Sequence, residues 1–117
     1  MILYINTSGN NLMEIAVKSR NKTIAAKKIK SHRSQAEKLL PAVEKLLKAN
    51  KLKLKNLSEI EVENRGGSFT SLRIGVITAN ALAYALGIPI VGSGGKGKKI
   101  VEPIYDREPE ITKKKSG

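Results

Sequence analysis

Cysteine is absent from this chain of 117 residues, and histidine occurs once, at His32. Without cysteine the chain has no disulfides, thiolate metal sites or thiol nucleophiles. A single histidine excludes histidine-rich metal sites, and a serine–histidine–aspartate relay would have to be built around His32 alone. Aromatic side chains are also scarce, with three tyrosines, one phenylalanine and no tryptophan. Surfaces that stack RNA bases usually need more of them.

Acidic side chains are few and show no pairing suited to general acid–base or two-metal catalysis. Glu14, Glu37 and Glu44 stand alone among lysines, and the three glutamates of residues 59–63 alternate, which places them on the solvent face of a strand. The turn at residues 7–10 could offer hydroxyls and amides to a phosphate, although a plain polar turn is the simpler interpretation. We therefore expect no catalytic residues, no metal site and no cofactor.

Positive charge is abundant, with 22 Lys and Arg against 10 Asp and Glu and a net charge of +12. Residues 1–57 hold 13 basic and 3 acidic side chains, and residues 96–117 hold 7 and 4. Such a balance can attract RNA through its phosphates, so a stand-alone basic RNA-binding module is one hypothesis. Between Ser68 and Gly95 the only charged residue is Arg73, so this segment is expected to be hidden from water.

The length favours a single domain, and its apolar pattern predicts an α/β domain with a mixed five-stranded sheet. Ser34 and Glu37 have the form of a capping box, and Pro41 should bend the helix that follows. We place the domain at residues 1–92 and a basic C-terminal tail at residues 93–117. The expected order is strand 2–5, strand 12–18, strand 23–29, helix 34–50, basic linker 51–58, strand 59–63, helix 69–86 and strand 88–91.

The second predicted helix is apolar on both sides. One face carries Leu72, Gly75, Val76, Ala79, Leu82, Ala83 and Leu86, and the opposite face carries Ile74, Ile77, Ala81 and Ala85. A helix that is apolar all round is buried all round, and one sheet covers only one side, so the other side needs a partner. The small residues at every fourth position, Gly75, Ala79 and Ala83, would suit either a partner or the chain's own sheet.

A membrane span is an alternative for residues 74–91, which carry no charge over about the minimum length for crossing a bilayer. The polar Thr78 and Asn80 and the break at residues 87–89 favour a helix and a strand outside a membrane. No secretory signal is visible in the first residues, so we expect a cytoplasmic protein.

Two segments together resemble the bacterial TsaB (YeaZ) family: residues 67–75, GSFTSLRIG, and residues 2–8, ILYINTS. The family pattern in the first segment is close to Gly-Pro-Gly-Ser-Phe-Thr-Gly-Leu-Arg-Ile-Gly. Arg65 and Gly66 replace its Gly-Pro, and Ser71 replaces a glycine. The resemblance covers residues 1–92. The residues that carry the motif are Gly67, Ser68, Phe69, Thr70, Arg73 and Gly75.

The resemblance implies an actin-like (ASKHA, ribonuclease-H-type) fold, normally present as two domains in tandem, of which this chain holds the first. Residues 103–109 resemble the last residues of longer members, so the chain looks internally shortened. Asn6 stands where ATP-binding relatives carry Asp, and an amide cannot hold a cation as a carboxylate does. We therefore do not expect ATP hydrolysis or nuclease activity from this chain.

As a TsaB-like protein, the chain would be a non-catalytic scaffold subunit that pairs with TsaD in threonylcarbamoyladenosine modification of tRNA. It would form a homodimer when alone and meet tRNA indirectly, through the complex. The resemblance places both contacts on the two predicted helices, in agreement with the surplus apolar face. The predicted interface residues are Leu39, Val43, Leu47, Leu72, Gly75, Val76, Ala79, Leu82 and Ala83.

Overall fold

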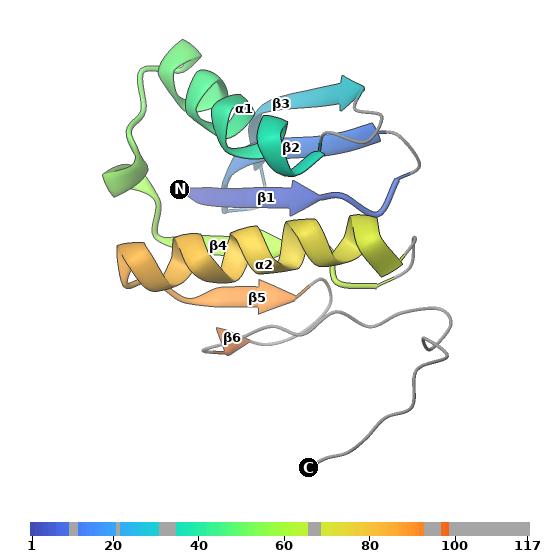
Figure 1. Cartoon of the computed structure of the whole chain (residues 1–117). Helices are drawn as coiled ribbons and strands as arrows, with labels where there is room; N and C mark the ends of the chain where they lie inside the picture. The colour runs from blue at the N-terminus through green and yellow to red at the C-terminus, as the bar shows by residue number, and fades with distance from the viewer. Residues whose placement is uncertain (10–11, 21, 31–34, 66–68, 93–96, 99–117) are drawn as a thin grey trace.

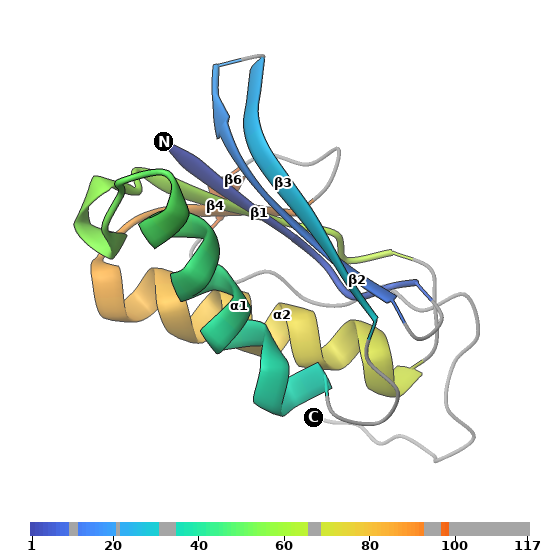
Figure 2. The same ribbon diagram turned by 90° about the horizontal axis from the view of Figure 1, so that it is seen from above.

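The chain folds into two layers, a mixed β-sheet and a pair of helices that cover one of its faces (Figures 1 and 2). The computed structural model describes residues 1–9, 12–20, 22–30, 35–65, 69–92 and 97–98. The elements in chain order are β1 (Ile2–Asn6), β2 (Leu12–Ser19), β3 (Lys22–Lys30), α1 (Gln35–Ala49), the 3-10 helix η1 (Leu54–Asn56), β4 (Glu59–Val62), α2 (Phe69–Leu86), β5 (Ile90–Gly92) and β6 (Gly97–Lys98).

The sheet has the strand order β3-β2-β1-β4-β5-β6. The central strands β1, β4 and β5 are parallel, and the flanking pairs β1–β2, β2–β3 and β5–β6 are antiparallel. The five predicted strands and both predicted helices are confirmed. The structure adds β6, a strand of two residues beyond the predicted domain boundary, and η1 within the predicted linker. Elements this short carry no periodic pattern, so the sequence did not indicate them.

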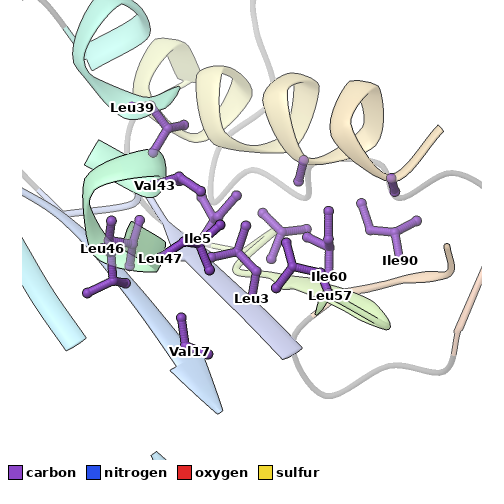
Figure 3. Close-up of a cluster of buried hydrophobic side chains, with 14 of the residues drawn as sticks. Leu3, Ile5, Val17, Leu39, Val43, Leu46, Leu47, Leu57, Ile60 and Ile90 are labelled. Atoms are coloured by element: carbon purple, nitrogen blue, oxygen red, sulfur yellow. The ribbon is translucent and has the colours of Figure 1, made fainter. Parts of the chain in front are cut away.

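The core lies between the helices and the sheet (Figure 3). Because side chains alternate across a strand, every second residue of β1 points to the helices, and Leu3 and Ile5 are fully buried there. Leu39 and Val43 of α1 meet them from the opposite layer, as Figure 3 shows. The other face of β1 carries Tyr4, which no helix covers within the described residues.

Both helices end in the same hydrogen-bonded motif, in which one residue adopts a left-handed backbone. At the end of α2, Gly87 has φ +68°, and the Ile88 N–H donates to the Ala83 carbonyl at 3.0 Å. At the end of α1, Lys51 has φ +59°, and the Leu52 N–H donates to the Leu47 carbonyl at 2.8 Å. Glycine adopts this conformation without steric cost, whereas lysine adopts it at a cost because it has a Cβ.

The sequence predicts a cap residue at the start of each helix and a bend at Pro41. The expected cap residues Ser34 and Ser68 lie outside the described residues. Helix α1 runs without interruption from Gln35 to Ala49 and contains Pro41 within it.

Helix α2 approaches the end of β1 closely at Gly75. The Gly75 N–H donates to the Thr7 hydroxyl oxygen at 3.1 Å, and both residues are buried. A Cβ at position 75 would meet the Thr7 hydroxyl first and would lie 3.0 Å from Thr7 Cγ2. Ala79 and Ala83, one and two turns further on, are 0% and 3% exposed. The stripe of small residues therefore lies on the chain's own sheet, which was one of its two interpretations.

Candidate functional site

The most distinctive surface of the described residues is the outer face of α2. Ile77 is 54% exposed and Tyr84, two turns later on the same side, is 90% exposed. Ala81 and Ala85 between and beside them are also exposed. Arg73 is the only charged residue in α2, so the face that points to solvent is apolar over most of its length. We call Arg73, Ile77, Ala81, Tyr84 and Ala85 the α2 outer face.

Helix α1 continues this surface on one flank. Leu40 is 44% exposed and lies on the side of α1 opposite Lys38, because two residues are about 200° apart on a helix. Lys38 faces β3, so Leu40 lies on the flank nearer to α2. The two helices pack against each other as well as on the sheet (Figure 2).

The predicted interface residues lie beneath this surface. Leu82 is partly buried. The remaining eight, Leu39, Val43, Leu47, Leu72, Gly75, Val76, Ala79 and Ala83, are buried. Their side chains are brought together between the helices and the sheet. On the described parts of the two helices, the large hydrophobic side chains that are exposed are others, namely Leu40, Ile77 and Tyr84.

Sequence reasoning placed Ile77 opposite the small residues but did not separate the two faces, because both are apolar. Tyr84 was not singled out. Its signal was its position seven residues after Ile77, which puts the two side chains on one side of the helix.

The polar turn after β1 uses its own hydrogen-bonding groups. The Asn6 Oδ1 atom accepts from the Ser8 N–H at 2.8 Å and from the Ser8 hydroxyl at 2.6 Å. The Thr7 hydroxyl oxygen accepts from α2, as described above. This arrangement favours the plain polar turn over a phosphate cradle. Among the described residues, no group of three or more His, Asp or Glu side chains comes together as a metal site would require.

The sheet face away from the helices is polar. Lys18 Nζ lies 3.2 Å from Glu61 Oε1 and 4.6 Å from the centre of the Tyr4 ring. Burial raises the pKa of the Tyr4 hydroxyl above its usual 10.0. A hydrogen bond with Asn6 opposes the increase, and the charges of nearby glutamates add to the increase in pKa. Glu61 lies on this face, as its alternation with apolar residues predicted.

The residues of the family motif do not converge on one site in the described structure. Gly67 and Ser68 lie outside the described residues, and Phe69 and Thr70 form the first turn of α2. Arg73 is exposed, and Gly75 is buried against Thr7. Within the described ranges, no helix is both long and apolar enough to cross a membrane.

Comparison with known proteins relates these features to a family. A family model described as "TsaD: tRNA N6-adenosine threonylcarbamoyltransferase" matches residues 22–93, from the start of β3 to just beyond β5. The tRNA threonylcarbamoyladenosine biosynthesis protein TsaB of Bacillus subtilis (strain 168) is 32% identical over 114 residues. That alignment covers 90% of this chain and 49% of the Bacillus protein.

Solved structures agree with the sequence relatives. YeaZ from Pseudomonas aeruginosa superimposes with a TM-score of 0.71 at 26% identity, over 78% of this chain and 42% of that one. A second Pseudomonas aeruginosa structure is of an uncharacterized protein with similarity to peptidase YeaZ. It superimposes with the same TM-score, and the alignment covers 41% of its chain.

The chain spans about half the length of the relatives it matches. The prediction of an actin-like α/β domain is confirmed by the likeness to YeaZ. Since the family model covers more than half of the chain and the relatives agree, this chain is a member of the TsaB (YeaZ) family.

Proposed function

We propose that this chain acts in threonylcarbamoyladenosine modification of tRNA as a non-catalytic scaffold subunit that pairs with a TsaD-like catalytic subunit. The observation that carries the proposal is the α2 outer face, a nearly uncharged helix surface left open to solvent. When no catalytic subunit is present, the same face pairs two copies of the chain. Contact with tRNA follows from assembly into the complex.

Energetics support a docking role for this face. Full burial of a large apolar side chain stabilises a complex by about 1.5–3 kcal/mol. Ile77 is 54% exposed and Tyr84 is 90% exposed, so Ile77 has about half and Tyr84 most of this stabilisation still to gain. The exposed alanines leave room for a partner helix to come close, and Leu40 extends the apolar surface onto α1.

The residues that sequence reasoning assigned to the interface have a different part in this proposal. They fill the layer between helices and sheet, and so they hold α1 and α2 at a fixed separation. The partner then contacts the side chains above them, with Ile77 and Tyr84 at the centre.

Family membership supports the scaffold role over a stand-alone RNA-binding module. The Bacillus relative is named for threonylcarbamoyladenosine biosynthesis, and the family model is named for the transferase that acts in the same modification. The absence of a catalytic role is part of the proposal. It is supported by Asn6, whose amide oxygen is engaged by Ser8 in the turn where ATP-binding relatives carry Asp.

Light scattering on the purified full chain, alone and mixed with a TsaD protein from the same source, tests the proposal. We expect a homodimer that exchanges into a heterodimer. Ile77→Glu and Tyr84→Glu should abolish both associations and leave thermal unfolding of the monomer unchanged, because both side chains are exposed.

The matched control is Ile24→Glu on the edge strand β3, where Ile24 is 43% exposed. This variant adds the same charge outside the α2 outer face and should associate like the parent. Association that survives both the Ile77→Glu and the Tyr84→Glu changes would contradict the proposed face.

A further inference from the structure

A groove of 370 Å³ runs between α1 and the edge strand β3, on the flank of α1 away from α2. Its apolar floor includes Ile29 and Ala42, which are partly buried against the core. Three lysines and one glutamate stand around this floor. The lining residues are Lys27, Ile29, Glu37, Lys38, Pro41, Ala42 and Lys45.

The two walls of the groove are strongly basic. Of the seven lysines and two glutamates that β3 and α1 carry, three lysines and one glutamate line the groove. None of Lys27, Lys38 and Lys45 forms an ion pair with a residue that the structure describes, whereas Lys18 is paired with Glu61 on the other face of the sheet. A second hollow, lined by Pro41, Glu44, Lys45 and Lys48, lies next to the groove.

The lysines of β3 have one ordinary role, since charge on an edge strand prevents pairing with other strands. That role needs charge only on the strand itself. It does not account for Lys38 and Lys45, which project from the facing helix into the same groove. These two lie seven residues apart, so the rigid helix holds them about 10 Å from each other.

We propose that this groove, which we call the lysine groove, binds the sugar-phosphate backbone of tRNA directly. The lysines neutralise phosphates, and the apolar floor accommodates the ribose edge. None of the described residues that line the groove is aromatic, so the contact reads backbone charge and not base sequence. The inference rests on the proposed function, which supplies tRNA as the polyanion, and it replaces indirect contact with direct contact.

The position of the groove leaves the α2 outer face free for a protein partner. The lysine groove and the α2 outer face lie on opposite flanks of α1, so one chain can hold a protein partner on one flank and RNA on the other.

Fluorescence anisotropy with a labelled, unmodified tRNA transcript tests the inference on the full chain, alone and in complex with TsaD. The test variant replaces Lys27, Lys38 and Lys45 with Gln. Each phosphate contact steepens the dependence of log K on log salt by about 0.7–0.9, so the variant should bind at least tenfold more weakly with a slope shallower by about 2–3.

Two controls separate the groove from general charge. Replacing Lys51, Lys53 and Lys55 with Gln removes the same charge from another exposed region and should change affinity by less than about threefold. Replacing the three groove lysines with Arg keeps the charge and should bind like the parent. Circular dichroism confirms that each variant is folded.

Equal losses in the two Gln variants would overturn the inference, because binding would then depend on diffuse charge. Polyglutamate that competes as well as tRNA would also overturn it, in favour of an acidic protein partner. Light scattering on the same samples keeps the two proposals distinguishable. If the groove variant pairs with TsaD and binds tRNA like the parent, the groove proposal is wrong and the scaffold proposal stands. If the parent does not pair with TsaD but binds tRNA through the groove lysines, the scaffold proposal is wrong and the groove proposal stands.

Discussion

Gly75 is a residue at which α2 comes close to the end of β1, and its missing side chain allows this approach. The Thr7 side chain occupies the space where a Cβ would stand, and its hydroxyl accepts the Gly75 N–H. Glycine in the middle of a helix costs about 1 kcal/mol relative to alanine. The contact with Thr7 offsets this cost, because it lets helix and strand pack without a gap.

Gly75→Ala should therefore destabilise the chain, although alanine is the better helix former. Overpacking costs about 1–3 kcal/mol, so after the gain of about 1 kcal/mol in helix propensity we expect a net loss of up to about 2 kcal/mol. Urea denaturation of the purified variant measures it. Ala81→Leu, which adds bulk on the exposed side of the same helix, should stay within about 0.5 kcal/mol of the parent. A Gly75→Ala variant more stable than the parent would refute the close contact.

At the scale of elements, the two helices end in the same motif with different residues in the left-handed position. Gly87 ends α2 in a conformation that glycine adopts freely. Lys51 ends α1 with φ +59°, a conformation that crowds a residue bearing a Cβ. The end of α1 therefore stores strain that the end of α2 does not.

Lys51→Gly should relieve this strain and stabilise the chain. The matched control is Lys51→Ala, which removes the same charge but keeps the Cβ. We expect the glycine variant to be more stable than the alanine variant by about 1 kcal/mol, measured by chemical denaturation. Equal stabilities would mean that Lys51 leaves the left-handed conformation in solution.

At the scale of the whole molecule, charge and apolar surface are sorted by region. Lysines line β3 and α1, while α2 carries only Arg73. The outer sheet face holds the Lys18–Glu61 ion pair. A net charge of +12 on 117 residues repels itself, and this repulsion opposes the compact state.

Moderate salt should therefore stabilise the folded chain. Raising KCl from about 10 mM to about 150 mM shortens the screening length from about 30 Å to about 8 Å, which weakens repulsion among the lysines. We expect the melting temperature to rise by a few degrees. The Lys18→Met variant, which lacks the ion pair with Glu61, should show a similar increase. A melting temperature that falls with salt would mean that attractive pairs outweigh the repulsion.

The sequence by itself determined the elements of this protein and their order. The alternation of apolar and polar residues predicts strands 12–18 and 59–63. The length of an apolar segment and the glycine that ends it predict the helix at residues 69–86. These signals are local, since burial on one side of a strand or helix imposes a period on the chain. The motif at residues 67–75 likewise fixed the family, which the comparisons confirm.

Tertiary structure alone decided which face of α2 meets the sheet. Both faces are apolar, so periodicity gives no preference between them, and the nine predicted interface residues turned out to lie in or beside the core. The buried face is the one on which Gly75 contacts Thr7, two residues far apart in the sequence. The sequence also contained no indication of the lysine groove. Its lysines come from β3 and α1, which lie side by side only because both pack on β2. Contacts between distant segments leave no local pattern in the sequence.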